Sequence, residues 1–357
     1  MRRILVTGAG GVGGINFVRA LRMAPERLFI VGTDYHYYYL LLAPVDVRYK
    51  SPRHDDPDFL HLILRIVKEH KVEFIHPQPE VEVEVLSARR DEVPVPMLIP
   101  NSEVIKVARD KYLTYLRLKE ANVPVPETRL YTDPDIECFL REMKKGWIRA
   151  RKGAGGRLSL PVSSFEELQL WARLWIKRGI IRPEELILQE YLPGRDIAWD
   201  SLWYKGELIA SYARERLAYI FPHLSPSRIT GTPTVARIIH DEKVNDVAFR
   251  AVKTIDQSPS GFYCVDLKED ASGIPNVTEV NIKAHTTLAL WSYAAIKALK
   301  LDPMFNMPYL YVKLGLGELD EVNKLGFNIY PEGLILVRHL DAGAILLTPR
   351  GEKLRVI

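Results

Sequence analysis

Hydrophobic and polar positions divide the chain into two regions with different patterns. Residues 1 to about 100 alternate short apolar runs with amphipathic segments, which predicts strands alternating with helices. The clearest helix is expected over 58–70, where apolar residues recur at helical spacing. Strands are expected over 3–8, 28–34, 72–76 and 97–99. This β-α-β order favours a parallel sheet with helices on both faces.

The pattern changes after about residue 100. A single long helix is expected from Ser102, as its cap, to Glu120, followed by a strand-helix-strand unit and a helix over 164–178. Later segments predict strands joined in sequence, one further helix over 244–255, and a terminal hairpin. The expected strands are 186–192, 197–204, 207–214, 262–267, 276–282, 334–338 and 344–348. The predicted fold class is therefore α/β followed by α+β.

Composition limits the classes of function. The 357 residues suit two or three domains, and 49 basic against 45 acidic residues are too evenly balanced for a nucleic-acid-binding protein. Apolar runs are too short to span a bilayer, and the N-terminus does not resemble a signal peptide. The two cysteines suit a reducing compartment. We therefore expect a cytoplasmic protein that acts on small molecules, without a nucleic-acid or membrane partner. The oligomeric state stays open, with a homodimer among the alternatives.

A first glycine cluster spans Gly8 to Gly13 and fits G-x-G-x-x-G directly after a strand. Asp34 ends the second strand, where an acid can bond a ribose hydroxyl. Taken alone, this pattern favours an NAD(P)-dependent oxidoreductase. The same glycines would also serve a tight turn and close packing of a helix without any ligand. Both interpretations stay open.

A second glycine-rich segment follows a strand that carries Arg149. Its residues 153–156 are small and are flanked by cations, so backbone N–H groups there could close over phosphates. The apolar strand starting at Leu186 ends in Glu190 and a turn, and its backbone could pair with a purine edge. The segment therefore indicates nucleotide binding.

Oxygen-bearing side chains follow on two later strands. Asp266 lies on one strand, and Glu279 and Asn281 lie two apart on the next, so they share a face. Carboxylate and amide oxygens converging from adjacent strands are what Mg²⁺ requires, with phosphate and water in the remaining positions. The sequence predicts a magnesium site at these three residues.

In this order the segments resemble the ATP-grasp superfamily, and within it the carbamoyl-phosphate synthase large-subunit-like branch, over nearly the whole chain. The synthase segment I-R-P-S-F-T-M-G-G aligns without a gap to residues 148–156, and E-x-N-x-R aligns to Glu279, Asn281 and Lys283. Lys283 replaces the family's arginine, which exchanges a bidentate fork for a point charge. The resemblance implies a Rossmann-like pre-ATP-grasp domain followed by a two-subdomain ATP-grasp fold. The implied boundaries are 1–101 for the first domain, 102–184 for the small subdomain with its lid, 185–330 for the large subdomain with the metal site, and 331–357 for the hairpin.

The resemblance also implies a role for each matching residue. Arg149 and Lys283 would be catalytic. Lys111 and Arg149 would hold the phosphates of ATP, under a lid formed by Gly153, Ala154, Gly155 and Gly156. The adenine would contact Glu190, Tyr191 and Leu192, and the ribose would lie near Asp196. The metal ligands would be Asp266, Glu279 and Asn281.

The implied activity is that of a Mg-ATP-dependent carboxylate–amine or carboxylate–thiol ligase. Such an enzyme activates a carboxylate as an acyl phosphate, which an amine or similar nucleophile then attacks. The expected cofactors are ATP and Mg²⁺, with Mn²⁺ as an alternative metal. Two other functions stay open, the NAD(P)-dependent oxidoreductase and a nucleotide-binding protein without ligase chemistry.

Overall fold

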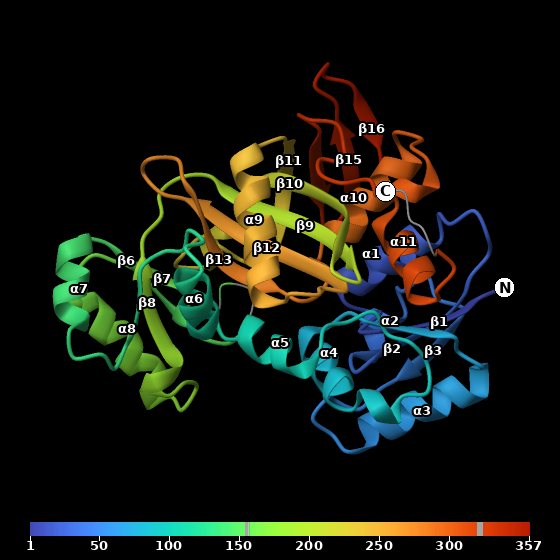
Figure 1. The fold of residues 1–357 in the computed structure, drawn as a ribbon, viewed down its shortest axis with the longest axis horizontal. Helices are drawn as coiled ribbons and strands as arrows, with labels where there is room; N and C mark the ends of the chain where they lie inside the picture. The colour runs from blue at the N-terminus through green and yellow to red at the C-terminus, as the bar shows by residue number, and fades with distance from the viewer. Residues whose placement is uncertain (154–155, 157, 320–323) are drawn as a thin grey trace.

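The computed structural model describes residues 1–153, 156, 158–319 and 324–357, and these form three β-sheets (Figure 1). The predicted lid residues Ala154 and Gly155 lie outside the described residues. A four-stranded sheet near the N-terminus lies beside a large eight-stranded sheet, and a second four-stranded sheet forms a separate lobe at the left of Figure 1. Among the described residues, no helix has the length and apolar character that a membrane span requires.

The N-terminal sheet is parallel throughout, in the order β3-β2-β1-β4. Its strands are β1 (Arg3–Thr7), β2 (Phe29–Asp34), β3 (Val47–Lys50) and β4 (Phe74–Pro77), and its helices are α1 (Val12–Leu21), α2 (Tyr37–Leu40), α3 (Asp58–His70) and α4 (Glu80–Ala88). Ile4 of β1 lies in one hydrophobic core with α1, whereas Leu5 lies in another with α3. The predicted parallel sheet with helices on both faces is therefore confirmed.

The separate lobe is an antiparallel sheet in the order β5-β8-β6-β7. It consists of β5 (Thr128–Leu130), α7 (Ile136–Met143), β6 (Gly146–Ala150), β7 (Leu160–Val162), α8 (Phe165–Lys177) and β8 (Leu186–Glu190). Ile148 and Leu188 pack with the two helices in a core that contains no residue of the other two sheets. The lobe therefore has an apolar interior of its own.

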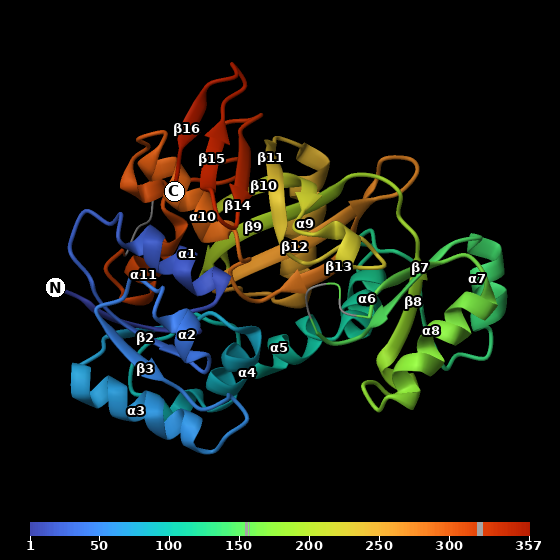
Figure 2. The same ribbon diagram turned by 180° about the vertical axis from the view of Figure 1, so that it is seen from behind.

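The eight-stranded sheet is antiparallel, in the order β13-β12-β9-β10-β11-β14-β15-β16. Its strands are β9 (Asp196–Tyr204), β10 (Glu207–Tyr219), β11 (Pro233–Ile239), β12 (Gly261–Glu269), β13 (Pro275–Asn281), β14 (Ile335–His339), β15 (Gly343–Leu347) and β16 (Lys353–Arg355). Helix α9 (Glu242–Ile255) packs on one face, whereas α10 (Leu288–Lys297) and α11 (Met307–Gly315) share a core with α1 (Figure 2). The predicted terminal hairpin is confirmed as β14 and β15, which extend this sheet because β14 pairs with β11.

The expected single helix from Ser102 to Glu120 is wrong, because the structure has two helices, α5 (Ser102–Ala108) and α6 (Lys111–Glu120). The second begins at Asp110, whose Oδ1 accepts hydrogen bonds from the backbone N–H groups of Tyr112 and Leu113 at 3.0 and 3.3 Å. A carboxylate that satisfies these N–H groups starts a new helix at its own position. This cap places Lys111 in the first turn of α6.

The expected strand over 97–99 is also wrong, since no strand pairing is found there among the described residues. The segment runs beside β4 but makes one ladder-like bond, from Ile75 N to Pro96 O at 3.1 Å. Prolines at 94, 96 and 100 lack the N–H donors that a ladder needs. Helices α2, α4, α10 and α11 and strands β3, β7, β11 and β16 were not predicted.

Candidate functional site

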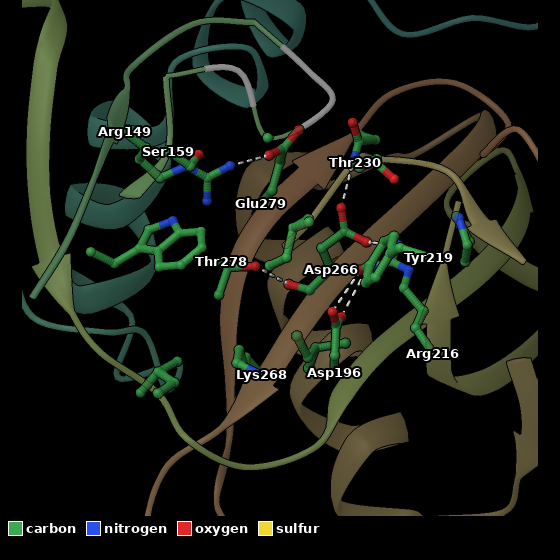
Figure 3. A pocket seen from close by; sticks show the side chains of 18 of the residues that line it. Arg149, Ser159, Asp196, Arg216, Tyr219, Thr230, Asp266, Lys268, Thr278 and Glu279 are labelled. Carbon is green, nitrogen blue, oxygen red and sulfur yellow. Dashed lines mark hydrogen bonds and ion pairs between the residues drawn. The ribbon is translucent and has the colours of Figure 1, made fainter. Parts of the chain in front are cut away.

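A cavity of about 340 Å³ lies between the lobe and the eight-stranded sheet (Figure 3). Its walls come from β6 and β8 on one side and from β10, β12 and β13 on the other. The predicted site residues that line it are Arg149, Gly156, Glu190, Tyr191, Leu192, Asp196, Asp266, Glu279, Asn281 and Lys283. Residues separated by more than a hundred positions thus meet at one cavity. Lys111 and Gly153 do not line it but lie at its margin, where the Lys111 Nζ is 3.4 Å from Glu279.

Two cations from different elements converge on one carboxylate. Arg149 on β6 donates from Nη2 to Glu279 Oε2 at 2.8 Å, and Lys111 Nζ lies 3.4 Å from the same oxygen. Lys111 also donates to the Gly153 carbonyl at 2.7 Å. Burial lowers the pKa of Lys111, and the negative charge of Glu279 offsets part of that effect. A phosphate group entering here would compete with Glu279 for both cations.

The wall that the lobe provides includes the end of β8, where the chain leaves the lobe. Glu190 is the last residue of β8 and lies opposite Gly146 of β6, and Leu192 is buried two residues further. Lys145 Nζ lies 3.8 Å from the centre of the Tyr191 ring. Trp147 also lines this wall, and sequence reasoning missed it. The signal was available, because Trp147 lies two residues before Arg149 and alternate residues of a strand share a face.

The three predicted metal ligands lie on adjacent strands. Asp266 and Glu279 are register partners in the β12–β13 pair, and Asn281 lies two residues beyond Glu279 (Figure 3). Asp266 Oδ2 accepts a hydrogen bond from Asn281 Nδ2 at 3.2 Å, and its Oδ1 is paired with Arg216. Burial alone would raise the pKa of Asp266, but Arg216 and His285 hold it well below its ordinary value. The three side chains offer oxygen ligands, two from carboxyl groups and one from an amide, which fits a magnesium ion.

Arg216 was not predicted, yet it bridges two predicted site residues. Its Nη1 donates to Asp196 at 3.1 Å and its Nη2 pairs with Asp266, while the Tyr219 hydroxyl donates to Asp196 at 2.6 Å (Figure 3). Asp196, the expected ribose contact, is therefore tied to Arg216 and Tyr219. A signal existed, since Arg214 and Arg216 lie two apart on one strand, so they share a face that must meet something polar.

A second group of polar residues missed by the sequence lies behind Asn281. His285 Nδ1 is 2.6 Å from Asp200 Oδ1, and the fully buried Asp200 also pairs with Arg214. Burial lowers the pKa of His285 to about 3, with Asp266 opposing that shift. Burial and the neighbouring Arg216 likewise lower the pKa of Arg214 to about 9. No local motif marks this group, because its members are far apart in sequence.

Lys283 lies two residues beyond the end of β13 and lines the cavity. It is partly buried, and no carboxylate lies within 4.0 Å of its Nζ among the residues the structure describes. The lysine is therefore available to an anion inside the cavity.

The N-terminal glycine cluster is filled by the protein itself. Both carboxylate oxygens of Asp34 accept backbone hydrogen bonds, from Gly10 N at 2.9 Å and from His36 N at 2.8 Å. A methyl group added at Gly13 would lie 2.5 Å from the Gln78 amide nitrogen. Both oxygens of Asp34 are thus engaged by the backbone of Gly10 and His36, and Gly13 is in close contact with Gln78, which fits the packing interpretation of the cluster.

A family model described as an ATP-grasp domain matches residues 108–287, which is half of the chain. No curated protein matches the chain. Three solved structures illustrate the similarity of fold. L-amino acid ligase from Bacillus licheniformis has a TM-score of 0.67 and 12% identity, with 94% of this chain and 79% of that chain covered. The 2-oxoglutarate carboxylase biotin carboxylase domain of Hydrogenobacter thermophilus, in complex with MgADP, ADP and bicarbonate, has a TM-score of 0.68 and 16% identity. The match covers 94% of this chain and 74% of that chain. N5-carboxyaminoimidazole synthetase from Staphylococcus aureus, complexed with ADP, has a TM-score of 0.68 and 14% identity. The match covers 95% of this chain and 82% of that chain.

Proposed function

The chain belongs to the ATP-grasp family, and from that membership we propose that it is a Mg-ATP-dependent ligase. It would transfer the γ-phosphoryl group of ATP to a carboxylate and release ADP. The resulting acyl phosphate would then be attacked by an amine or a thiol, with loss of inorganic phosphate. The carboxylate–amine reaction is the principal proposal, because the solved structures of similar fold include an amino acid ligase.

One observation supports this proposal most directly. The cavity brings together a strand end suited to a purine, two cations suited to phosphates and three oxygen ligands suited to a metal. These groups come from separate stretches of the chain and share no other evident reason to meet. Phosphoryl transfer asks a protein mainly to position the reactants and to neutralise charge, which such a set can do.

We assign the steps to the chain's own residues as follows. Lys111 and Arg149 would bind the phosphates in exchange for their present contact with Glu279. Asp266, Glu279 and Asn281 would hold the magnesium ion, which supplies charge neutralisation to the transferring phosphoryl group. Lys283 would bind the carboxylate of the substrate. No nucleophilic side chain is needed, because the carboxylate itself attacks the phosphorus.

We also propose a role for each part of the chain. Residues 1–101 would act as the pre-ATP-grasp domain, 102–184 as the small subdomain and 185–330 as the large one, with 331–357 as an appended hairpin. The loop after β13 contacts the N-terminal sheet, through Asn16 to the Thr286 carbonyl and Gln78 to the Ala284 carbonyl, both at 3.0 Å. We propose that the acceptor substrate enters along this junction.

Ligand-dependent stabilisation separates the proposal from the oxidoreductase alternative. A ligand that binds only the folded state raises the melting temperature by mass action. Mg-ATP at about a hundred times its dissociation constant should add about 2.7 kcal/mol of stability, and NADH should add none. A shift with NADH and none with Mg-ATP would overturn the proposal.

Product release separates a ligase from a nucleotide-binding protein without chemistry. The protein is incubated with ATP, magnesium, pooled carboxylates and pooled amines, and ADP and phosphate are measured. ADP release that depends on both pools supports the ligase. Binding of ATP without release of ADP under any combination supports the binding protein instead.

A further inference from the structure

Asn281 differs from the other two proposed metal ligands because an amide has one accepting atom and one donating atom. Only its Oδ1 can bind a cation, so the amide must have one orientation. Its Nδ2 donates to Asp266 Oδ2 at 3.2 Å and lies 3.1 Å from His285 Nε2. Both N–H groups are thereby directed toward protein side chains, those of Asp266 and His285. Among the described residues, no donor contacts Oδ1.

The ring of His285 is fixed on its other side. Nδ1 lies 2.6 Å from Asp200 Oδ1, and a carboxylate at this position accepts, so Nδ1 carries the proton. The Nε2 lone pair is then left to accept from Asn281. Asp200 cannot turn away, because it is fully buried and ion-paired with Arg214. The ring therefore presents an acceptor to the amide in a fixed direction.

The backbone that carries His285 is also held on both sides. Gln78 donates to the Ala284 carbonyl and Asn16 donates to the Thr286 carbonyl, each at 3.0 Å. Both donors belong to the N-terminal part of the chain, and neither lines the cavity. The position of the ring is thus set from outside the metal site.

From these contacts we propose that His285 is a positioning residue, which orients the Asn281 amide so that its oxygen faces the magnesium ion. The proposal rests on the proposed function, because it assigns a role within that metal site. Removing the Nε2 acceptor leaves one N–H of the amide without a partner and lets the amide turn its NH₂ group toward the cation. Loss of such an outer contact commonly weakens metal binding by about 10- to 100-fold.

The test measures metal affinity directly, without relying on turnover. Mn²⁺ is titrated into the full-length protein in the presence of ADP, and free Mn²⁺ is followed by electron paramagnetic resonance. Three variants are compared with the wild-type protein. His285→Leu removes both ring nitrogens, and His285→Gln restores one acceptor and one donor at about the separation of the ring nitrogens. Cys264→Ala is the matched control, because Sγ lies within 4.8 Å of His285 and Asp200 ligand atoms, yet among the described residues it makes no hydrogen bond to the Asn281 amide.

We expect His285→Leu to raise the Mn²⁺ dissociation constant by at least about tenfold, His285→Gln to stay within about threefold of wild type, and Cys264→Ala to be unchanged. Steady-state assays should show the same loss as a higher magnesium requirement, with kcat recovered at saturating metal. If His285→Leu fails to fold, His285→Met gives the same comparison at similar volume. Equal Mn²⁺ affinity in the wild-type and leucine or methionine proteins would overturn the proposal. If the wild-type protein itself bound no Mn²⁺ with ADP, the proposed function would fail instead.

Discussion

The two glycine-rich segments of this chain look alike as sequence and differ completely in their surroundings. At the first, a methyl group placed on Gly8, Gly10, Gly13 or Gly14 would collide with the protein's own atoms. At the second, no atom of the described residues lies within 4 Å of such a methyl group on Gly153, and one on Gly156 would meet the carbonyl of Ile229 at 3.0 Å beside the cavity. The first set of glycines makes room for packing, whereas the second leaves space open. A glycine motif therefore predicts close approach but not what approaches.

The largest effect is expected where the open segment meets the proposed metal site. Glu279→Gln removes the charge shared by Arg149 and Lys111 at nearly constant shape. ATP turnover should fall by about 10³-fold, while the protein stays folded in a thermal scan. Glu215→Gln is the control, since Glu215 is ion-paired with Arg237 on the same sheet but does not line the cavity. Turnover of the Glu279 variant within about twofold of wild type would place the metal elsewhere.

Substitutions in the first glycine cluster should change the stability of the protein rather than its turnover. A methyl group at Gly14 would overlap the Gly8 carbonyl, so Gly14→Ala should lower the free energy of unfolding by about 3 kcal/mol. Gly11→Ala is the matched variant, because its nearest atom would be 3.4 Å away, and the expected cost is below about 1 kcal/mol. Chemical denaturation of both variants checks this. Equal stability of the two would mean that the first cluster is not close-packed.

A buried carboxyl group beneath the filled segment should make stability depend on pH. Burial, with Asp34 nearby, raises the pKa of Glu82 from 4.5 to about 7. The folded protein then holds a proton that the unfolded chain releases, so the contribution of Glu82 to stability is fully present below pH 4.5 and is lost as pH rises through about 7. The total loss is about 3 kcal/mol.

Glu82→Gln should remove this dependence and stabilise the protein at pH 8 relative to wild type. Melting temperatures at pH 5 and pH 8 give the measurement, and Glu120→Gln, which changes an exposed carboxylate, is the control. An unchanged difference between the two pH values in the Glu82 variant would refute the assignment.

The smallest effect is expected for a substitution of Gly153, in the second glycine-rich segment. Its φ of 109° is unfavourable for alanine, but the position is exposed and unobstructed. Gly153→Ala should lower the free energy of unfolding by about 1 kcal/mol through this backbone strain and raise the KM for ATP by about three- to tenfold. An unchanged KM would show that this glycine takes no part in nucleotide binding.

The predictable parts of the site were those set by local spacing. Arg149 follows from a cation on a strand before glycines, and Glu279 and Asn281 from alternation along β13. The fate of the first glycine cluster could not be predicted, because Leu40, Gln78 and Pro79 fill it from later segments. The separation of α5 from α6 at Asp110 could not be predicted either, because only the hydrogen bonds of the Asp110 cap distinguish two helices from one.

The roles of His285 and Arg216 could not be predicted from the sequence for a related reason. His285 meets Asp200 across 85 positions, and Arg216 meets Asp266 across 50. A lone histidine or an alternating arginine indicates a polar environment but does not identify the partner. Tertiary pairing decided these roles, and no periodicity along the chain encodes it.

The two carbonyl contacts that hold the His285 loop also have a consequence for how the protein folds. They join residues separated by 270 and 206 positions, so neither can form until most of the chain has been synthesised. The N-terminal sheet, with its local β-α-β connections, can assemble much earlier. During refolding, helix and sheet signals should therefore recover before nucleotide binding does. The end of the cavity that carries Lys283 is among the last parts of the molecule to become native.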